Sequence, residues 1–255
     1  MKAPKTISLL GAGYLGLNFA KSLKKDSFRL KLSTTHREKQ HSLKQLGFDS
    51  FLYTLGEEDK DAFLQSDYLF ILTPPSEEVL MGLKKINVTN FSQTKIIYTS
   101  SIGIYDSQLK TFPEDFSLTP RTPRQKLLLE IEKAIAKFSQ HMIIRLGGLI
   151  GETRHPAHSL SHQKIVREGE TPINLSHLDD ILSLFSYILK EFRPGLYHFV
   201  SEGHPLKRDF YAKECTRMHL SCPLFEEGGN PERIIRSNKI KEVYGLKLPI
   251  RFTID

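Results

Sequence analysis

The pattern Gly11-x-Gly13-x-x-Gly16 constrains this chain more than any other feature of its sequence. It follows an apolar run over 6–10 and opens a stretch with helical spacing, which predicts a strand, a tight turn and a helix. In such a unit the glycines permit the turn, the approach of a pyrophosphate and close helix–strand packing, while the helix N-terminus offers unpaired N–H groups. We therefore expect a dinucleotide site formed by Gly11, Gly13, Tyr14, Leu15 and Gly16. The alternative is a glycine-rich turn with a structural role only.

The end of the second predicted strand is expected to select the cofactor. An acidic side chain there would hydrogen-bond the adenosine ribose and would repel a 2′-phosphate. This chain instead has Thr34, Thr35 and Arg37, with no carboxylate before Glu38. Because Arg37 can donate charge-assisted hydrogen bonds to a phosphate, the sequence favours NADP over NAD. In the alternative, Arg37 only begins the next helix and the two threonines serve either cofactor.

The segment "FILTPPSEEV" ends the fourth predicted strand. At that position Thr73 and Pro74 would lie beside the glycine loop, where a rigid turn with few donors can line the cofactor channel. A plain turn that ends the strand fits the same residues equally well.

Strand-like and helix-like stretches alternate along the first 150 residues. Strands are expected at 6–10, 28–34, 50–54, 68–72, 95–99 and 141–146, and helices at 38–46, 76–86 and 125–138. This alternation predicts a Rossmann-like α/β fold, a doubly wound parallel sheet with right-handed crossovers, over residues 1–150.

Residues 151–255 are expected to form a smaller α/β substrate lobe, partly threaded back into the first domain. The segment starting at Gly151, "GETRHPAHSLSHQK", is polar and turn-like. A long helix over 178–192 and a strand over 195–201 should follow it. The last two predicted segments are a helix over 206–219 and a short strand leading into a helix over 233–246.

The net charge of +7 does not indicate a nucleic-acid partner, because basic residues are scattered and mixed with acidic ones. The densest cluster comprises Lys21, Lys24, Lys25, Arg29 and Lys31. It is expected to be a solvated face, or else to attract an anionic cofactor over a distance. No run approaches the roughly 18 apolar residues of a membrane span, and no cleavable signal pattern is present. We therefore expect a cytoplasmic protein with a small-molecule substrate, and a homodimer is left open.

The two cysteines, Cys215 and Cys222, do not have metal-ligand spacing. Together with the absence of an export signal, this argues against a disulfide or a metal site. No residue is therefore assigned to a metal.

The segment "IIYTSSIGIYD" resembles the "SSxxVYG" element of the extended short-chain dehydrogenases, the epimerase and dehydratase group. The resemblance implies that Ser101 hydrogen-bonds a substrate carbonyl or hydroxyl, with Tyr105 nearby. That group also uses a Tyr-x-x-x-Lys pair, in which tyrosine is the general acid or base and lysine holds the nicotinamide ribose. None of the nine tyrosines precedes a lysine at that spacing. Thr122 stands at the tyrosine position, and Lys126 keeps the lysine spacing.

More of the chain is similar to one branch of this group, the atypical YeeZ-like short-chain dehydrogenases. The segments that carry the similarity are "GAGYLG", "TSSIGIYD", "TPRTP", "RLGGLIGETRHP", "INLSHLDDIL" and "KIKEVYGL". The resemblance spans about residues 4 to 250 and implies an NAD(P)-dependent, epimerase/dehydratase-like protein. The active-site tyrosine is usually missing in that branch as well, so Thr122 fits it.

Two histidine-bearing motifs have both a functional and a structural interpretation. His155 follows the sixth predicted strand and could replace the missing tyrosine as acid or base, because imidazole titrates near neutral pH. The alternative is a loop histidine that orders the turn through hydrogen bonds. The segment "NLSHLDD" places His177 at a helix start, with Ser176 or Asp179 as a candidate N-cap. A structural role is favoured there, with His177 as a minor candidate for substrate contact.

Three hypotheses follow for function. The first is an oxidoreductase or epimerase acting on a small polar substrate, in which Ser101 orients the reacting carbonyl, Lys126 contacts the ribose, and His155, Tyr105 or a water transfers the proton. The second is a non-catalytic dinucleotide-binding protein that reports cofactor state, motivated by the missing tyrosine, since losing a general acid or base costs about 10²–10⁴ in rate. The third is a β-hydroxyacid dehydrogenase-like enzyme, which would need an all-helical second domain.

Overall fold

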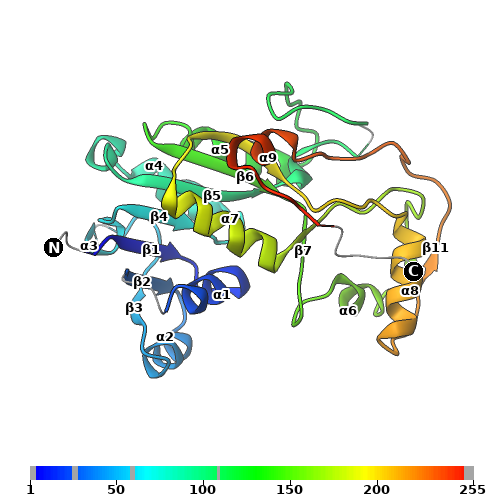
Figure 1. Ribbon diagram of the computed structural model, residues 1–255, viewed down its shortest axis with the longest axis horizontal. Helices are drawn as coiled ribbons and strands as arrows, with labels where there is room; N and C mark the ends of the chain where they lie inside the picture. The colour runs from blue at the N-terminus through cyan, green and yellow to red at the C-terminus, as the bar shows by residue number, and fades with distance from the viewer. Residues whose placement is uncertain (1–3, 25–27, 58–60, 108–109, 250–255) are drawn as a thin grey trace. The chain divides into compact units, whose positions relative to one another are not determined.

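A seven-stranded sheet organises the protein. The computed structural model describes residues 4–24, 28–57, 61–107 and 110–249 (Figure 1). The strand order is β10-β6-β5-β4-β1-β2-β3, and the pairs β1–β2, β1–β4, β2–β3 and β4–β5 are parallel. The strands are β1 (Thr6–Leu10), β2 (Arg29–Thr34), β3 (Asp49–Leu52), β4 (Tyr68–Ile71), β5 (Lys95–Ser101), β6 (His141–Leu146) and β10 (Gly195–Phe199). The predicted Rossmann-like α/β fold is confirmed.

Helices connect these strands. They are α1 (Tyr14–Ser22), α2 (Arg37–Gln45), α3 (Asp61–Leu64), α4 (Glu77–Lys85), the 3₁₀ turns η2 (Val88–Phe91) and η3 (Ile102–Ile104), α5 (Pro123–Ile135) and α7 (Leu178–Lys190). The remaining elements are β7 (Gly148–Ile150), α6 (Pro156–Leu160), β8 (Ile165–Val166), β9 (Leu175–His177), α8 (Lys207–Arg217), β11 (Leu224–Phe225) and α9 (Asn238–Tyr244). The predicted strands at 6–10 and 141–146 are confirmed to the residue, and the other predicted strands of the first 150 residues differ only at their ends, whereas the short strand β7 was not predicted.

One predicted strand is wrong. Residues 233–236 form no strand, because side chains take the backbone groups that a strand would use for its ladder. The Ile235 N–H donates to Asn174 Oδ1 at 2.9 Å. Asn174 Nδ2 also donates to the Arg233 carbonyl oxygen at 3.0 Å. The helix predicted to follow is present as α9.

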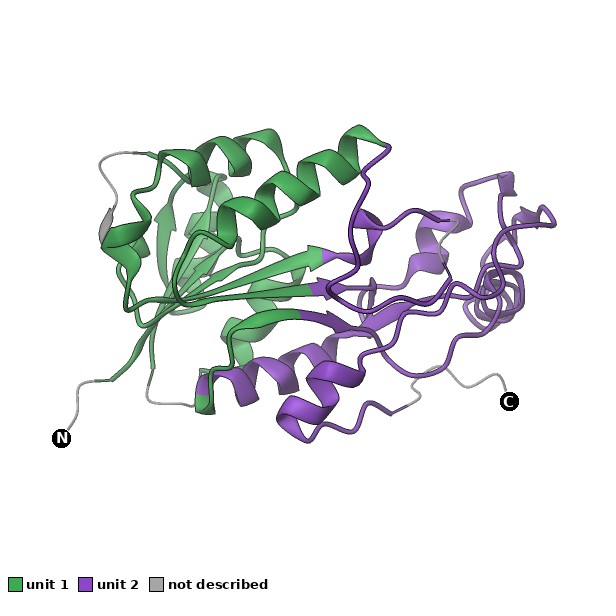
Figure 2. Ribbon diagram, turned by 90° about the horizontal axis from the view of Figure 1, so that it is seen from above, with its two compact units in different colours: residues 1–100, 122–144, 190–196 green, residues 101–121, 145–189, 197–255 purple. Residues whose placement is uncertain are grey.

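The chain divides into two compact units, shown in separate colours in Figure 2. Unit 1 holds residues 1–100, 122–144 and 190–196, and unit 2 holds residues 101–121, 145–189 and 197–255. Each unit therefore takes segments from both sides of residue 150. The division at 150 into two separate domains stays a prediction.

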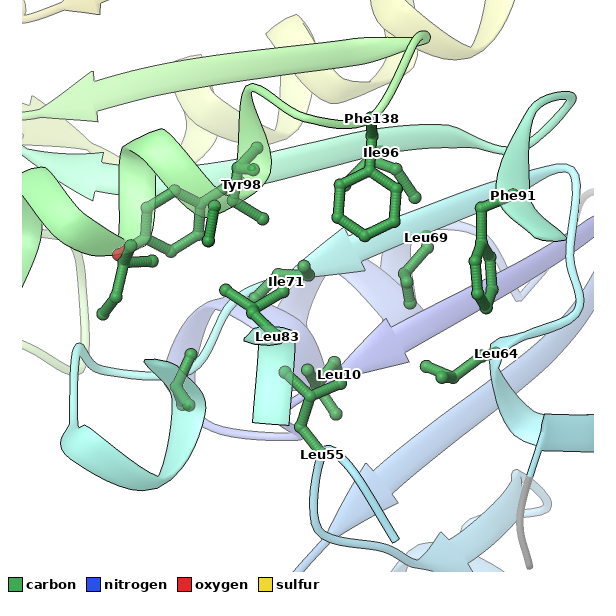
Figure 3. Close-up of a cluster of buried hydrophobic side chains, with 14 of the residues drawn as sticks. Leu10, Leu55, Leu64, Leu69, Ile71, Leu83, Phe91, Ile96, Tyr98 and Phe138 are labelled. Carbon is green, nitrogen blue, oxygen red and sulfur yellow. The ribbon is translucent and has the colours of Figure 1, made fainter. Parts of the chain in front are cut away.

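Unit 1 buries both faces of its strands. On one face Leu10, Ile71 and Tyr98 belong to one apolar cluster with side chains of α4 and α5 (Figure 3). On the other face Phe70 packs against Phe19 of α1, with ring centroids 4.9 Å apart. Because strand side chains alternate between faces, a parallel sheet covered on both sides requires nearly continuous apolar strands. This explains why those runs were recognisable in the sequence.

Unit 2 has short strands as well as helices. β7 pairs with β9 and β8 pairs with β11, all in parallel. Its apolar cluster is formed by Ile150, Ala157, Ile173, Leu175, Phe210, Tyr211 and Cys215. The β-hydroxyacid dehydrogenase hypothesis needs an all-helical second domain, and unit 2 is not all-helical.

The structure also shows the surroundings of the basic cluster and of the two cysteines. In the basic cluster, Lys31 is buried and donates to the Gln65 carbonyl, and Lys24 donates to the Leu46 carbonyl; Lys25 lies outside the described residues. Both cysteines are free thiols. The described residues contain no group of three or more side chains suited to hold a metal ion. Among those same residues, every helix is too short or too polar to cross a bilayer.

Candidate functional site

The glycine loop between β1 and α1 has three glycines with different roles. Gly11 has a φ of +99°, and a Cβ there would lie 2.7 Å from Thr73 Cγ2. A Cβ on Gly16 would lie 2.2 Å from the Gly11 carbonyl oxygen, so that glycine is needed for helix–strand packing. A Cβ on Gly13 would meet nothing within 4 Å. The protein itself therefore imposes no steric demand for glycine at position 13.

The N-terminus of α1 is arranged for an anion. Gly13 is its N-cap, no side chain caps the helix, and its first turn contains no acidic residue. The first N–H groups of a helix have no partner within it, and they carry the positive end of the helix dipole. The loop is held in place because the Gly11 and Ala12 N–H groups donate to the side-chain and backbone oxygens of Ser33 on β2.

A cavity of about 630 Å³ adjoins this loop within unit 1. Of the predicted cofactor residues, it is lined by Gly11, Gly13, Thr34, Thr35, Thr73 and Pro74. The other predicted residues, Tyr14, Leu15, Gly16 and Arg37, are not among its lining residues. Arg37 is the exposed first residue of α2, as the alternative interpretation of its role expects. Whether it contacts a 2′-phosphate stays a prediction.

Sequence reasoning missed two lining residues with cationic potential, His36 and Lys39. His36 is the N-cap of α2, and Lys39 lies in the first turn of that helix. Lys39 could have been predicted from its position in the first turn of α2, because that helix begins just after the end of β2. The carboxylate on this cavity is Glu78, which comes from α4 rather than from β2.

The residues around this cavity fit a dinucleotide. Gly13 offers open space beside an uncapped helix N-terminus. In addition, the Oγ1 of Thr73, a lining residue, is shielded from solvent and has no hydrogen-bond partner among the described residues. Buried polar atoms normally find a partner, so an orphan beside a cavity is consistent with a polar ligand.

The Ser101 hydroxyl can still donate a hydrogen bond to a substrate. It is the last residue of β5 and the N-cap of η3, where its Oγ accepts the Gly103 N–H at 3.0 Å. A hydroxyl that accepts one hydrogen bond can still donate its own hydrogen. The local geometry is therefore compatible with the role that the family resemblance implies, and that role stays a prediction.

Tyr105 lies in a buried polar network of unit 2. Its hydroxyl accepts from Arg145 and lies 2.5 Å from His198 Nε2, and all three side chains are buried. Because the hydroxyl accepts from a guanidinium, its own hydrogen points to His198, whose Nε2 is then the acceptor. The Glu114 carboxylate accepts the backbone N–H of His198 at 3.2 Å, and the Glu114 backbone carbonyl accepts from Arg145 at 3.1 Å. With its hydroxyl used in this way, a catalytic role for Tyr105 has no direct support and stays a prediction.

Thr122 stands where the family's tyrosine would be, and its hydroxyl caps a helix. Its Oγ1 accepts the Gln125 N–H at 3.2 Å while Gln125 Oε1 accepts the Thr122 N–H at 3.1 Å, a complete capping box. Lys126, one turn further along α5, is exposed. These contacts are within unit 1. They give Thr122 a structural function, while the catalytic assignments of Thr122 and Lys126 remain predictions.

Replacing Thr122 by alanine should lower the free energy of unfolding by about 1 kcal/mol, the usual cost of losing a threonine N-cap. Urea unfolding of Thr122→Ala against wild type measures this. Thr119→Ala, at an exposed threonine outside any helix, is the matched control and should change stability little. Equal stabilities of Thr122→Ala and wild type would show that the capping box contributes nothing.

His155 behaves as the turn-ordering histidine of the alternative interpretation. Its Nδ1 accepts the Ala157 N–H at 3.1 Å and so caps α6, while its Nε2 lies 3.1 Å from Glu214 Oε2. Burial, opposed by Glu214, lowers the pKa of this imidazole. Both ring nitrogens are therefore engaged, and its proposed acid–base role would require Glu214 to release Nε2.

Unit 2 brings His155 and His177 to one cavity of about 570 Å³, together with Glu214 and Arg217 of α8. His177 ends β9, and its Nδ1 accepts the Asp179 N–H at 3.3 Å. The neighbouring Ser176 is not a helix cap. Its buried hydroxyl accepts from the Gly147 N–H and donates to the Phe199 carbonyl. Ser176 thus ties together three segments of unit 2.

Comparison with known proteins finds similarity both in sequence and in structure. No family model matches the chain. It is 27% identical to Protein YeeZ of Escherichia coli (strain K12) over 238 residues, which cover 87% of this chain and 86% of that protein.

Solved structures share the fold along nearly the whole chain. A conserved protein of unknown function from Silicibacter pomeroyi is 20% identical with a TM-score of 0.79, over 96% of this chain and 93% of that one. The dTDP-glucose 4,6-dehydratase of Bacillus anthracis, solved with NAD, is 13% identical with a TM-score of 0.79, over 97% and 93%. The UDP-glucuronic acid 4-epimerase of Bacillus cereus has a TM-score of 0.78 at 15% identity, over 97% and 95%. The chain is therefore similar to Protein YeeZ along most of its length, as its motifs predict, and it shares the fold of these solved structures.

Proposed function

We propose that the protein binds a nicotinamide dinucleotide, NADP in preference to NAD, and acts as an oxidoreductase or epimerase on a small polar substrate. The observation that carries the proposal is the glycine-loop cavity. Gly13 leaves open space next to the uncapped N-terminus of α1, where a pyrophosphate would be stabilised by N–H groups and the helix dipole. The structural neighbours solved with NAD have the same fold, which supports the same class of ligand.

The preference for NADP rests on charge at the end of β2. Thr34, Thr35 and His36 line the cavity there, and Lys39 adds a cation. No carboxylate of β2 lines it, so nothing on that strand would repel a 2′-phosphate. Lys39 and Arg37, both in the first turn of α2, are the two candidates to neutralise it.

In the proposed reaction the bound cofactor would accept or donate a hydride at the substrate carbon, and His155, Tyr105 or a water would accept or donate the proton at the substrate oxygen. Ser101 is assigned the hydrogen bond to the substrate carbonyl or hydroxyl, because its Oγ has a backbone donor in place and can still donate. A hydrogen bond from Ser101 to the developing oxyanion would stabilise the transition state more than the ground state. Lys126 is assigned the contact with the nicotinamide ribose, because its spacing from Thr122 is that of the family's Tyr-x-x-x-Lys pair.

Titration with NADPH and NADH, followed by nicotinamide fluorescence, tests the cofactor. We expect NADPH to bind more tightly than NADH. Lys39→Ala and Arg37→Ala should each weaken NADPH about 10-fold and leave NADH nearly unchanged, because a charge-assisted hydrogen bond contributes about 1.5–3 kcal/mol. Lys44→Ala, an exposed lysine in the last turn of α2, is the matched control. Equal weakening of NADH by these variants would refute a 2′-phosphate contact, and no binding of either cofactor would refute the proposal.

A second candidate function is a non-catalytic dinucleotide sensor. It is favoured by the capping box of Thr122, which gives the residue at the tyrosine position a structural task. Turnover distinguishes the two. Oxidation of NADPH with a panel of carbonyl compounds that is abolished in Ser101→Ala, with cofactor affinity unchanged, supports the enzyme; binding without turnover across the panel supports the sensor.

A further inference from the structure

A cavity of about 370 Å³ in unit 2 is lined by two cationic side chains, Lys207 and Arg233. Tyr211 and Asn174 also line it, and Glu168 is its one acidic lining residue. Lys207 and Tyr211 also line an adjoining cavity of about 650 Å³, which adds Arg154 and has no carboxylate among its lining residues. The two cavities together therefore present an excess of positive charge.

Arg233 is poorly compensated by the protein around it. Its Nε is shielded from solvent and has no hydrogen-bond partner among the described residues. No carboxylate of the described chain forms a salt bridge with it; Glu168 and Asp106 act on it only from a distance. Burial lowers the pKa of this guanidinium. A buried N–H donor without an acceptor costs about 1–3 kcal/mol, and more when the group is charged.

The backbone that carries Arg233 is fixed in place. Asn174 Nδ2 donates to the Arg233 carbonyl at 3.0 Å, and Asn174 Oδ1 accepts the Ile235 N–H at 2.9 Å. Asn174 itself is buried. This clamp fixes the backbone from which the Arg233 side chain reaches the cavity, so less backbone freedom is lost when a ligand binds.

Lys207 brings a second cation with an incomplete set of acceptors. Its Nζ donates to the Arg167 carbonyl at 3.1 Å and lies 3.9 Å from Glu168 Oε2, which is beyond hydrogen-bond distance. Burial lowers the pKa of this ammonium too; the charge of Glu168 opposes the shift, and the charge of Arg233 adds to it. Two cations that disfavour each other would be stabilised by one anion between them.

We propose that Arg233 and Lys207 form an oxyanion site that binds a phosphate or carboxylate group of a small molecule. If the proposed function is right, that molecule is the substrate, and this inference rests on it to that extent. Arg233 would offer a planar fork that matches two oxygens, and Lys207 a point charge. Tyr211, whose pKa burial raises to about 12, remains a neutral hydroxyl beside them.

The test measures the stability of the cofactor-free protein as inorganic phosphate or malonate is added at constant ionic strength. A ligand at concentration c that binds only the folded state raises the free energy of unfolding by RT ln(1 + c/Kd), so the unfolding temperature rises with the logarithm of ligand concentration once that exceeds Kd. We expect this dependence with at least one of the two anions, and the anion with the lower fitted Kd identifies the group. Arg233→Gln should raise the fitted Kd at least 10-fold, and Lys207→Met should raise it severalfold.

Three further variants separate binding at this site from binding of the anion elsewhere on the protein. Lys164→Met, at an exposed lysine of unit 2 that does not line the cavity, should respond like wild type. Arg233→Lys keeps the charge without the fork and should bind more weakly than wild type but better than Arg233→Gln. Gly13→Ala should be stabilised by the anion as much as wild type is. This result would show that the anion does not bind at the glycine loop, and it does not depend on whether NADPH binds there.

Two outcomes would overturn the proposal. One is a wild-type protein that neither anion stabilises beyond chloride. The other is a response that survives in Arg233→Gln and is lost in Gly13→Ala, which would assign the anion to the nucleotide site. Circular dichroism of each variant establishes that it is folded before its response is compared.

Discussion

Gly13→Ala is expected to weaken the binding of NADPH and NADH alike by roughly 100-fold while leaving the fold intact. The new Cβ would meet no protein atom within 4 Å, so it would project into the space proposed for the pyrophosphate. A methyl group in a space filled by ligand costs about 1–3 kcal/mol of strain, and 1.4 kcal/mol corresponds to a factor of ten. Fluorescence titration with both cofactors measures the loss.

The unfolding free energy of Gly13→Ala should stay within about 0.5 kcal/mol of wild type. Gly13 has an extended backbone, with φ −73° and ψ −159°, that alanine can adopt. The small loss from an alanine N-cap is offset by the lower entropy of the unfolded chain.

Gly16→Ala is the matched contrast, three residues further along the chain. Its Cβ would lie 2.2 Å from the Gly11 carbonyl oxygen, so α1 would have to move away from the loop. It should lose about 1–3 kcal/mol of stability. Wild-type affinity in Gly13→Ala would contradict a pyrophosphate at this loop, because the open space would then have no ligand to accommodate.

Acid should destabilise the protein through His198. Burial, together with the Arg145 charge and against the pull of Glu114, lowers the pKa of His198 to about 4 from an ordinary 6.5. The folded protein therefore holds this imidazole neutral, while the unfolded chain takes up a proton below about pH 6.5. The stabilisation is complete above that pH and is lost as pH falls toward 4, by about 3 kcal/mol, since each pKa unit corresponds to 1.36 kcal/mol.

Urea unfolding between pH 7 and pH 4 of wild type and His198→Gln isolates this contribution. His155 and His204 also have pKa values lowered by burial, so they add to the acid sensitivity of both proteins and cancel in the difference. The stability advantage of wild type over His198→Gln should shrink by about 3 kcal/mol toward pH 4. His162→Gln, at an exposed histidine, is the control. An advantage that does not change with pH would refute the buried neutral histidine.

The structure also shows where sequence reasoning was limited. The sequence indicates Arg37 as the cation for a 2′-phosphate because it is the first arginine or lysine after β2, but the cavity is lined by Lys39. The family motif places Tyr105 near Ser101, yet its hydroxyl is hydrogen-bonded to His198, 93 positions away in the chain. The oxyanion site of Arg233 and Lys207 was not foreseen, since no local pattern joins those residues.

The sequence by itself determined the strand–loop–helix unit at the N-terminus, the alternation of strands and helices, and the resemblance to YeeZ. Those features depend on neighbours in the chain, namely the period of apolar residues and the spacing of glycines, and both are readable along a single segment. Only the tertiary structure decided which polar side chains line cavities and which make structural hydrogen bonds instead. Thr122, His155 and Tyr105 have the chemistry of a site, but hydrogen bonds to particular partners set their roles. Such partners, whether a few residues away or on remote segments, are chosen by packing, which leaves no periodic trace in the sequence.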